Sequence, residues 1–501
     1  MLTTTVGVQL NSSIGVQYGD STLSQIGNSS TTTDNDYYEF TPLLLLSDDA
    51  GADSVSNPLN PVSSGLQNVD VMIKNFGSND LTSCDIHWEV NGVPQTPYIW
   101  AGSLSFNESS APITLGTYDF MNSTNTVKCW TTNPNGGSDP NNANDTIIQS
   151  LFMPMSGTYS IGGASPDYTD FASAAADLSL RGVDGPVEFI IAPGTYYEQL
   201  TLPEISGANT SNRITFNGLD SSLVTLSHDA SLQQATILLD GADYIAFRNM
   251  TIEGTASSEC WGVMLINAAN NNTIDSCAIK MSPSGTSDVT GIVSSAELDN
   301  DGVYGDNANY TTISNNCITG GQYAINLRGI SSTVGNVGTV VENNRIRNAN
   351  SGGVYLYAQD SIRVIKNDIN GMRSIISYAV YGYYINIFEI SGNNIIAKDI
   401  GIYLRNVNDD TPPGSNSLFI NNMIISDNDD AVYCYSVEYT DIAHNSLKGE
   451  PGIYMDNFTN FDIRNNIFYS ETDLAFESGE NAAAFTALDN NIYFTPISNS
   501  N

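Results

Sequence analysis

Short segments in which apolar and polar residues alternate make up most of the chain, and this alternation predicts an all-β protein. In the first third it is clearest in "LQNVDVMIKNFG", "TSCDIHWEV" and "NTVKCWTT", and the Asn-Gly pair of "VNGVP" predicts a hairpin turn. Residues 66–152 are therefore expected to form an immunoglobulin-like β-sandwich. One stretch, "DYTDFASAAADLSLRG" (167–182), has apolar residues at helical spacing, and Gly182 would end that helix.

After residue 156 an apolar-x-Asn-Asn-x-apolar pattern recurs, as in "TISNNCIT", "VVENNRIRN" and "FDIRNNIFYS". The fourth positions of this pattern lie 21 to 39 residues apart, at Met250, Cys277, Asn316, Asn344, Asn367, Asn394, Asn422, Asn445, Asn466 and Asn491. One set of short strands per repeat, with no helix between them, predicts a right-handed parallel β-helix over residues 156–501. Stacked coils would join the asparagines in a hydrogen-bonded ladder, at a corner where asparagine tolerates a left-handed backbone.

The segments before the sandwich are less regular. Residues 1–46 mix short alternating stretches with Ser/Thr/Asn-rich turns and are expected to be an N-terminal β segment, part of a preceding domain. Residues 47–65 are rich in Pro, Ser, Asp and Gly and are predicted to be a linker. The N-terminus has neither the basic start nor the apolar core of a signal peptide, so we expect a portion of a larger chain or assembly.

The net charge of the chain limits the kinds of molecule that it can bind. The chain has 54 Asp and Glu against 16 Lys and Arg, a net charge of −38. This balance excludes a sequence-independent nucleic-acid binder, because such proteins neutralise phosphates with Lys and Arg. It also disfavours anionic membranes and strongly anionic polysaccharides, and it favours solubility and divalent cations. No apolar run of the sequence is long enough to span a membrane.

Two parts of the sequence resemble known families. "VDVMIKNFGSNDLTSCDIHWEVNGVPQTPYIWAGSL", "ITLGTYDF" and "NPNGGSDPNNANDT" resemble the CARDB-type adhesion module of secreted bacterial proteins. "GTYSIGGASPDYTDFASAAADLSLRGVDGPVEFIIAPGTYYEQLTLPEISGANTSNRITFNG" resembles the entry of pectin-lyase-like β-helix domains in large secreted surface proteins of Bacteroidetes-type bacteria. The resemblance implies an extracellular protein, secreted or attached to the cell surface, whose helix caps the solenoid. It implies no particular activity, because this superfold hosts many functions.

Stacking would also place outward-facing residues in columns. Triplets such as "GVYLY", "AVYGY" and "GIYLR" point their middle residue outward. The two predicted columns are Asn326, Tyr355, Tyr381, Tyr403, Tyr433 and Tyr454, and Arg328, Tyr357, Tyr383, Arg405, Tyr435 and Asp456. A flat face of tyrosines edged by arginines suits stacking against sugar rings, so these residues are predicted to bind glycans or neighbouring proteins. The alternative is a structural face, because tyrosine also stabilises exposed strands.

Acidic clusters suggest calcium as a cofactor. The 39-residue gap before Asn316 contains "ELDNDGVYGDNANY", where Asp299, Asp301 and Asp306 are the preferred metal ligands. A second candidate is the run 139–145, with Asp139, Asn141, Asn142, Asn144 and Asp145, for which a plain polar turn is the alternative. Counting five residues beyond each repeat asparagine gives a third, the acidic column Asp399, Asp427, Glu450 and Glu471. These four carboxylates are expected to be splayed into water or bridged by a cation.

An enzyme of the pectin-lyase-like superfold is the main functional alternative. The resemblance offers Arg328 and Arg405 as bases of a polysaccharide lyase, or the pair Asp429 and Asp430 in "DNDDAVYC" as carboxylates of a glycoside hydrolase. The Gly-His-Gly and Arg-Ile-Lys companions of the hydrolase motif are missing, and the histidines support no Ser-His-Asp set. The favoured hypothesis is therefore a non-enzymatic surface adhesin or fibre component, with the enzyme and a purely structural stalk as alternatives.

Overall fold

The structure is a computed structural model that describes residues 46–495 apart from 122, 230–234, 284–286, 301, 332–333, 376 and 408–415. It also gives the backbone of three short strands before residue 46. The chain divides into two compact units, Met1–Met153 and Pro154–Asn501. This boundary falls between the predicted sandwich and the predicted β-helix.

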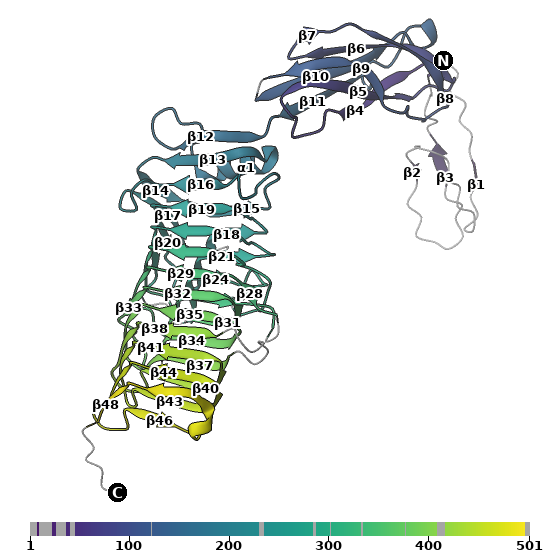
Figure 1. Cartoon of the computed structure of the whole chain (residues 1–501). Helices are drawn as coiled ribbons and strands as arrows, with labels where there is room; N and C mark the ends of the chain where they lie inside the picture. Colours follow the sequence, from purple (N-terminus) through teal and green to yellow (C-terminus); the bar gives the residue numbers. More distant parts are fainter. Residues whose placement is uncertain are drawn as a thin grey trace. The chain divides into compact units, whose positions relative to one another are not determined.

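The N-terminal unit consists of antiparallel sheets (Figure 1). The described strands of the first 46 residues are β1 (Val8–Gln9), β3 (Tyr37–Phe40) and β2 (Leu23–Ile26), paired in that order. A second sheet joins β11 (Thr146–Phe152), β10 (Thr124–Thr132), β6 (Leu81–Val90) and β7 (Val93–Pro94), with β8 (Tyr98–Leu104) also on β6. A third joins β4 (Ala50–Asn57), β5 (Gly65–Asn75) and β9 (Ile113–Phe120).

The second and third of these sheets share one core, because their strands alternate as the sequence predicts. Val71 of β5 and Ile86 and Trp88 of β6 are buried in the same cluster. The Asn-Gly turn joins β6 to β7, with φ of 51° at Asn91 and 76° at Gly92, as a two-residue hairpin requires. The alternation therefore located β5, β6 and β10, whereas the immunoglobulin-like subclass stays a prediction.

The prediction of a linker at 47–65 is wrong over its first half. Strand β4 lies within this range and pairs antiparallel with β5. Its small apolar residues Ala50, Ala52 and Val55 are buried, whereas Asp53 between them is exposed. Small residues mixed with Ser and Asp resemble linker composition, so the weak alternation went unrecognised.

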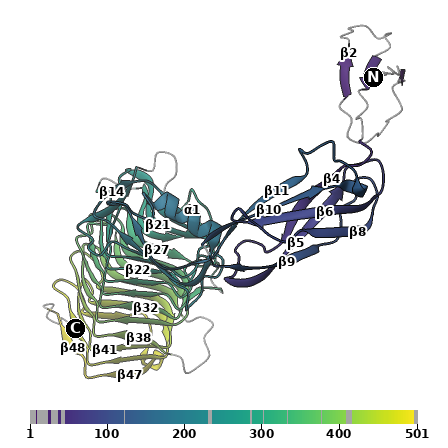
Figure 2. The ribbon, with the colours of Figure 1, turned by 90° about the horizontal axis from the view of Figure 1, so that it is seen from above.

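The C-terminal unit is a parallel β-solenoid of about 12 coils, built from three long sheets (Figures 1 and 2). The first sheet contains β12 (Met155–Ile161), β13 (Val183–Ile191), β16 (Ile214–Asn217), β19 (Ile245–Arg248), β22 (Thr273–Asp275), β25 (Thr312–Ser314), β29 (Val340–Glu342), β32 (Ile362–Ile365), β35 (Phe388–Ser391), β38 (Ser417–Ile420), β41 (Thr440–Ala443), β44 (Phe461–Arg464) and β47 (Phe485–Asp489). The second contains β14 (Gly194–Tyr197), β17 (Val224–His228), β20 (Thr251–Gly254), β23 (Ala278–Met281), β26 (Cys317–Thr319), β30 (Arg345–Arg347), β33 (Asp368–Asn370), β36 (Asn394–Ala397), β39 (Met423–Ser426), β42 (Ser446–Lys448), β45 (Ile467–Tyr469) and β48 (Ile492–Phe494).

The third sheet of the solenoid carries the residues that matter most for function. Its strands are β15 (Leu200–Pro203), β18 (Ala235–Asp240), β21 (Ser258–Ile266), β24 (Ser287–Ser294), β27 (Tyr323–Arg328), β31 (Gly352–Asp360), β34 (Tyr378–Ile385), β37 (Ile400–Val407), β40 (Val432–Glu438), β43 (Ile453–Thr459) and β46 (Phe476–Ser478), with β28 (Asn336–Val337) beside β31. Parallel pairing in register stacks equivalent residues of successive coils. The parallel β-helix prediction is thus confirmed as a parallel solenoid, and its right-handedness stays a prediction.

One α-helix precedes the first coil. α1 (Phe171–Arg181) begins at Asp170, whose side chain accepts a hydrogen bond from the backbone N of Ser173, and it ends at Gly182 with φ of 62°. Its buried face joins the solenoid core, where the ring of Phe171 stacks on that of Phe216 at 6.0 Å. That α1 caps the solenoid stays a prediction. In the described part of the chain, no helix is both apolar enough and long enough to cross a bilayer.

The repeated asparagines form the predicted ladder. Each except the last, Asn491, donates from its backbone N and its Nδ2 to Oδ1 of the asparagine one coil further on, as Asn422 does to Asn445 at 2.8 and 3.0 Å. The ladder residues are Asn316, Asn344, Asn367, Asn393, Asn422, Asn445, Asn466 and Asn491. Asn394 was predicted in place of Asn393. Each corner needs a residue with left-handed backbone just before the ladder asparagine. Gly392 (φ 66°) takes this position before Asn393, and Asn421 (φ 59°) takes it in the next coil.

Candidate functional site

The outer face of the third sheet presents the first predicted column. Strand register places Tyr355, Tyr381, Tyr403, Tyr433 and Tyr454 in line, and we call these five the tyrosine column. Asn326 precedes them and Glu477 of β46 follows them in the same register. The column was thus predicted correctly from the apolar triplets, except for Glu477.

The rings of the tyrosine column stack on one another. Neighbouring centroids are 4.6, 5.2, 4.7 and 5.0 Å apart, at interplanar angles between 3° and 14°. Both faces of Tyr381, Tyr403 and Tyr433 are therefore covered by other tyrosines, and sugar rings cannot stack on them. The column instead presents ring edges and hydroxyl groups, which form hydrogen bonds. The predicted face-to-face mode of binding needs this correction.

A second column, Arg328, Tyr357, Tyr383, Arg405, Tyr435 and Asp456, runs beside the first. The guanidinium of Arg405 lies 5.5 Å from the ring centroids of both Tyr383 and Tyr435. That of Arg328 lies 4.7 Å from the ring of Tyr355. Among the ion pairs of the described residues, none includes Arg328 or Arg405. The two cations are thus held by aromatic rings.

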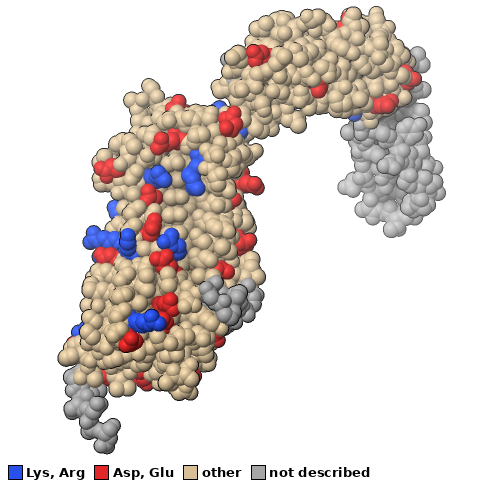
Figure 3. Space-filling view, in the orientation of Figure 1, with Lys and Arg blue, Asp and Glu red and all other residues tan. Residues whose placement is uncertain are grey.

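Charge elsewhere on the solenoid is more evenly matched. Figure 3 shows basic and acidic residues interspersed over one face, and the first sheet pairs Arg363 with Glu389 at 2.9 Å and Arg464 with Asp462 at 2.6 Å. Exposed pairs of this kind add little stability. They contrast with Arg328 and Arg405, whose guanidinium groups lie against aromatic rings.

A group of carboxylates lies beside the tyrosine column on the C-terminal coils. Asp430 directly precedes Ala431 and β40 and is only 6% exposed, and its Oδ1 is buried without a hydrogen-bond partner. Burial, reinforced by the carboxylates of Asp429, Glu477 and Asp473, raises the pKa of Asp430 to about 8. A buried carboxyl that stays protonated at neutral pH is a typical feature of a general acid.

The neighbours of Asp430 connect it to the tyrosines. Its backbone N donates to Oδ1 of Asp429 at 2.9 Å, which orients the Asp429 carboxyl group. Asp399 lies one coil earlier, and burial and the charge of Asp429 raise its pKa. Burial raises the pKa values of Tyr433 and Tyr454, and the Asp430 carboxyl adds to both shifts once it is ionised; Asp429 adds in the same way to the burial-raised pKa of Tyr378. These acids thus lie near the C-terminal tyrosines of the column.

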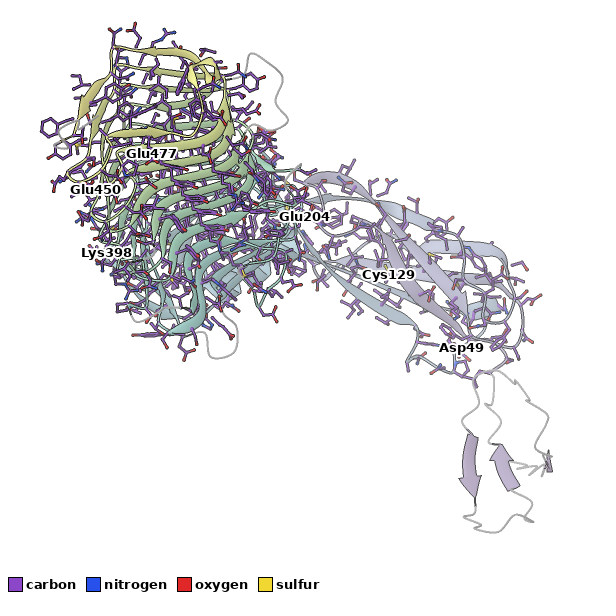
Figure 4. All side chains as sticks on the ribbon, turned by 90° about the horizontal axis from the view of Figure 1, so that it is seen from below. Asp49, Cys129, Glu204, Lys398, Glu450 and Glu477 are labelled. Atoms are coloured by element: carbon purple, nitrogen blue, oxygen red, sulfur yellow. The ribbon has the colours of Figure 1, made fainter. Side chains whose placement is uncertain are left out.

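The predicted acidic column separates into unlike positions, because the turns differ in length between coils. Glu450 caps the next turn by accepting hydrogen bonds from Ser470 Oγ, Thr472 Oγ1 and the backbone N atoms of Glu471, Thr472 and Asp473. Burial opposes ionisation there, but these hydrogen bonds lower the pKa of Glu450 to about 2. Glu471 forms a 2.7 Å ion pair with Lys448. Neither needs a bridging cation. Figure 4 shows Glu450 and Glu477 on the same side of the solenoid.

The preferred metal site in the long insertion stays a prediction. Asp301 lies outside the described residues, and Oδ1 of Asp306 accepts a hydrogen bond from Asn309 at 2.5 Å. Among the described residues, no three His, Cys, Asp or Glu side chains form a metal-binding group, so Asp299 and Asp306 gain no third described ligand. The insertion does reach the second column, where the ring of Tyr304 stacks on that of Tyr357 at 4.3 Å.

Sequence reasoning missed several members of this site. The structure joins Asp429 and Asp430, which were predicted as a pair, to Glu477, Asp473 and Tyr378, which were not. Arg328 and Arg405 are not part of this group: besides burial, the main causes that raise the pKa of Asp430 are the carboxylates of Asp429, Glu477, Asp473 and Asp399. Extending the triplet alignment by one coil, to "AFES", would have found Glu477. No sequence signal indicated that Tyr304 would reach the second column.

No protein-family model and no curated protein matches the chain. Among solved structures, a CARDB domain from Pyrococcus furiosus, in complex with di-metal ions, is 16% identical (TM-score 0.18) and covers 22% of this chain and 91% of its own. A family 28 exopolygalacturonase from Yersinia enterocolitica is 10% identical (TM-score 0.33; 88% and 99% covered). Pectin methylesterase from carrot is 12% identical (TM-score 0.30; 67% and 89% covered). These neighbours include a CARDB domain and pectin-lyase-like β-helix proteins, and such low TM-scores carry no argument about function.

Proposed function

We propose that the protein is a carbohydrate-active enzyme, a glycoside hydrolase that binds a polysaccharide along the tyrosine column and cleaves it at Asp430. The observation that carries this proposal is the state of Asp430: a buried carboxyl, protonated at neutral pH, that adjoins further carboxylates and a row of outward hydroxyl groups. A purely structural carboxyl would normally find hydrogen-bond donors, as Glu450 does.

The proposed chemistry assigns different roles to neighbouring carboxyl groups. Asp430 donates its proton to the glycosidic oxygen that leaves, because its raised pKa keeps it protonated. Asp399 or Asp429 provides the second carboxyl group, which activates water or attacks the sugar directly. The tyrosine column orients the chain through its hydroxyl groups. The lyase alternative is weaker, because Arg405 lies between two tyrosine rings and not beside the acids.

A non-enzymatic glycan binder is the second candidate, and the second column favours it. Arg405 is exposed, is held in place by two rings, and belongs to none of the ion pairs among the described residues. A guanidinium presented in this way offers donors to sugar hydroxyl or acidic groups. The favoured adhesin hypothesis thus becomes the alternative, since it gives no role to a protonated, unpartnered Asp430.

Incubation of the purified chain with plant, algal and bacterial polysaccharides tests the enzymatic proposal. We expect new reducing ends from at least one polysaccharide, and a rate lowered about 100-fold or more in Asp430→Asn, which cannot donate the proton. Asp427→Asn changes an exposed carboxyl of the same turn and should keep full activity. Cleavage that survives Asp430→Asn, or binding without any cleavage, would refute the assignment.

The tyrosine column can be tested separately by its hydroxyl groups. Tyr403→Phe combined with Tyr433→Phe keeps the stacked rings and removes the groups that face the ligand. We expect affinity for the responsive polysaccharide to fall about thirtyfold, because two hydroxyl groups that each contribute roughly 1 kcal/mol are lost. The melting temperature should change little. Unaltered affinity in calorimetric titrations would leave the column a purely structural feature.

A further inference from the structure

A separate acidic cluster lies in the N-terminal unit. Asp49 and Asp145 are 4% and 7% exposed, and Asp139 is half-buried. The loop 139–145 packs against β4: Oδ2 of Asp139 accepts a hydrogen bond from the backbone N of Ala50 at 3.0 Å. Gly51 permits this close approach, since a Cβ there would lie 2.5 Å from the main-chain oxygen of Asn144. Figure 4 shows Asp49 at one end of the unit's sheets.

Several oxygen atoms of this cluster lack a hydrogen to accept. Oδ1 of Asp145 and Oδ1 of Asn144 are buried without a hydrogen-bond partner. The side-chain oxygen of Asn142 faces two other oxygens. It lies 3.1 Å from Oδ2 of Asp145 and 3.3 Å from the main-chain oxygen of Asp139. Turning this amide would give those two atoms a donor, but it would leave the buried oxygens of Asn144 and Asp145 unsatisfied. Unpaired buried oxygens are costly unless a proton or cation lies among them.

No basic side chain balances this charge. The one ion pair among the described residues of the unit joins Lys128 to Glu89, on other strands. Amide groups supply the donors that Asp49 has: Asn144 at 2.8 Å and Asn141 at 3.2 Å. Asn141 donates both to Oδ1 of Asp139 at 3.0 Å and to Oδ2 of Asp49 at 3.2 Å, so these two carboxyl groups are held close together and repel each other when both are ionised. A divalent cation would remove that repulsion.

We propose that the loop 139–145, together with Asp49, binds a calcium ion. Asp145 contributes its carboxylate and Asn142 and Asn144 their amide oxygens, while Asp49 and Asp139 add negative charge. Calcium fits this oxygen-only set, because it accepts six to eight oxygen ligands in flexible geometry, whereas magnesium demands an octahedron and zinc prefers nitrogen and sulfur. Since no three acidic side chains of the described residues converge as ligands, amide and main-chain oxygens complete the shell. The ion would fasten the loop to β4.

Calorimetric titration of the chelator-stripped full chain with calcium chloride tests this site. We expect one saturable site in the unit and an unfolding temperature that rises with calcium. Asn142→Ala changes an exposed residue that the fold does not need, and it should weaken calcium affinity at least tenfold. Asp145→Asn should weaken calcium affinity to a similar extent, because the charged ligand oxygens of this side chain are lost. Asp53→Asn, an exposed carboxyl on β4, is the matched control and should bind as the wild type does.

Three results would overturn the proposal: no calcium binding by the wild type at millimolar concentration, equal affinity in Asn142→Ala and the wild type, or equal occupancy by magnesium. Binding that survives both loop variants would place calcium elsewhere, for instance at Asp299 and Asp306. Far-ultraviolet circular dichroism of each variant in chelator separates loss of the ion from loss of the fold. Activity on polysaccharides is not the readout, so failure of this site leaves the solenoid proposal untouched.

Discussion

Asn422→Ala is expected to destabilise the solenoid by about 3–5 kcal/mol, close to the largest effect that a single substitution produces. The side chain of Asn422 makes four hydrogen bonds: it accepts from the backbone N and Nδ2 of Asn393 and donates to Ile390 O and Asn445 Oδ1. Alanine would remove these partners from Asn393 and Ile390 on the preceding coil, and it would take one of two donors from Oδ1 of Asn445 on the next. The urea midpoint of the C-terminal unit, followed by circular dichroism, measures the loss.

Asn421→Gly is the matched control for this prediction. Asn421 is exposed and has φ of 59°, a conformation that glycine adopts freely, and Gly392 already fills the equivalent corner one coil earlier. This variant should unfold within about 0.5 kcal/mol of the wild type, because a permitted backbone state is retained. A small effect of Asn422→Ala, or equal effects at the two neighbouring positions, would show that the ladder is not what holds the coils together.

Asp430→Asn is expected to change how stability depends on pH. The folded pKa of about 8 lies above the reference value of 3.8, so folding favours the protonated acid. This contribution is fully present below pH 3.8 and is lost as pH rises through 8. Each unit of separation corresponds to about 1.4 kcal/mol, and with relaxation around the charge we expect a loss of roughly 2–4 kcal/mol. Asparagine cannot ionise, so the variant should avoid the loss and exceed the wild type in stability above pH 8.

Urea unfolding from pH 4 to pH 9 gives the measurement, and the difference between variant and wild type isolates this group from other carboxylates. Asp427→Asn, which removes an exposed carboxyl of the same turn, serves as the control. A difference curve for Asp430→Asn that does not change with pH would mean that Asp430 ionises freely in the folded protein. That result would also remove the general acid from the proposed hydrolase.

The solenoid could be predicted from the sequence because local chemistry dictates its repeat. An apolar residue before and after the asparagine corner, and a residue that tolerates positive φ at the corner, are needed in every coil. The sequence alignment placed the wrong asparagine in the ladder in one coil. In "SGNN" glycine takes the left-handed position, so Asn393 and not Asn394 belongs to the ladder. A sequence alignment compares residue types, whereas membership of the ladder depends on backbone position and hydrogen bonding.

The candidate site was only partly visible in the sequence. Tyr403 and Tyr433 could be paired from their triplets because strand register is regular. The sequence indicated Asp430 as one of a pair of aspartates, but it could not predict the protonation of this residue. Its burial and the approach of Glu477 depend on turns of unequal length. In the same way, the amide oxygens of Asn142 and Asn144 become candidate ligands only because the loop packs against β4.

By itself the sequence determined the all-β class, the parallel solenoid, the asparagine ladder and the outward rows of tyrosines, because each follows from periodicity and from what one residue type can do at one backbone position. The tertiary structure decided that the tyrosines cover one another's faces, that β4 belongs to a sheet, and that Asp430 is buried among carboxylates. These facts depend on which segments, distant in the sequence, come into contact, and no local pattern encodes the energy of such contacts.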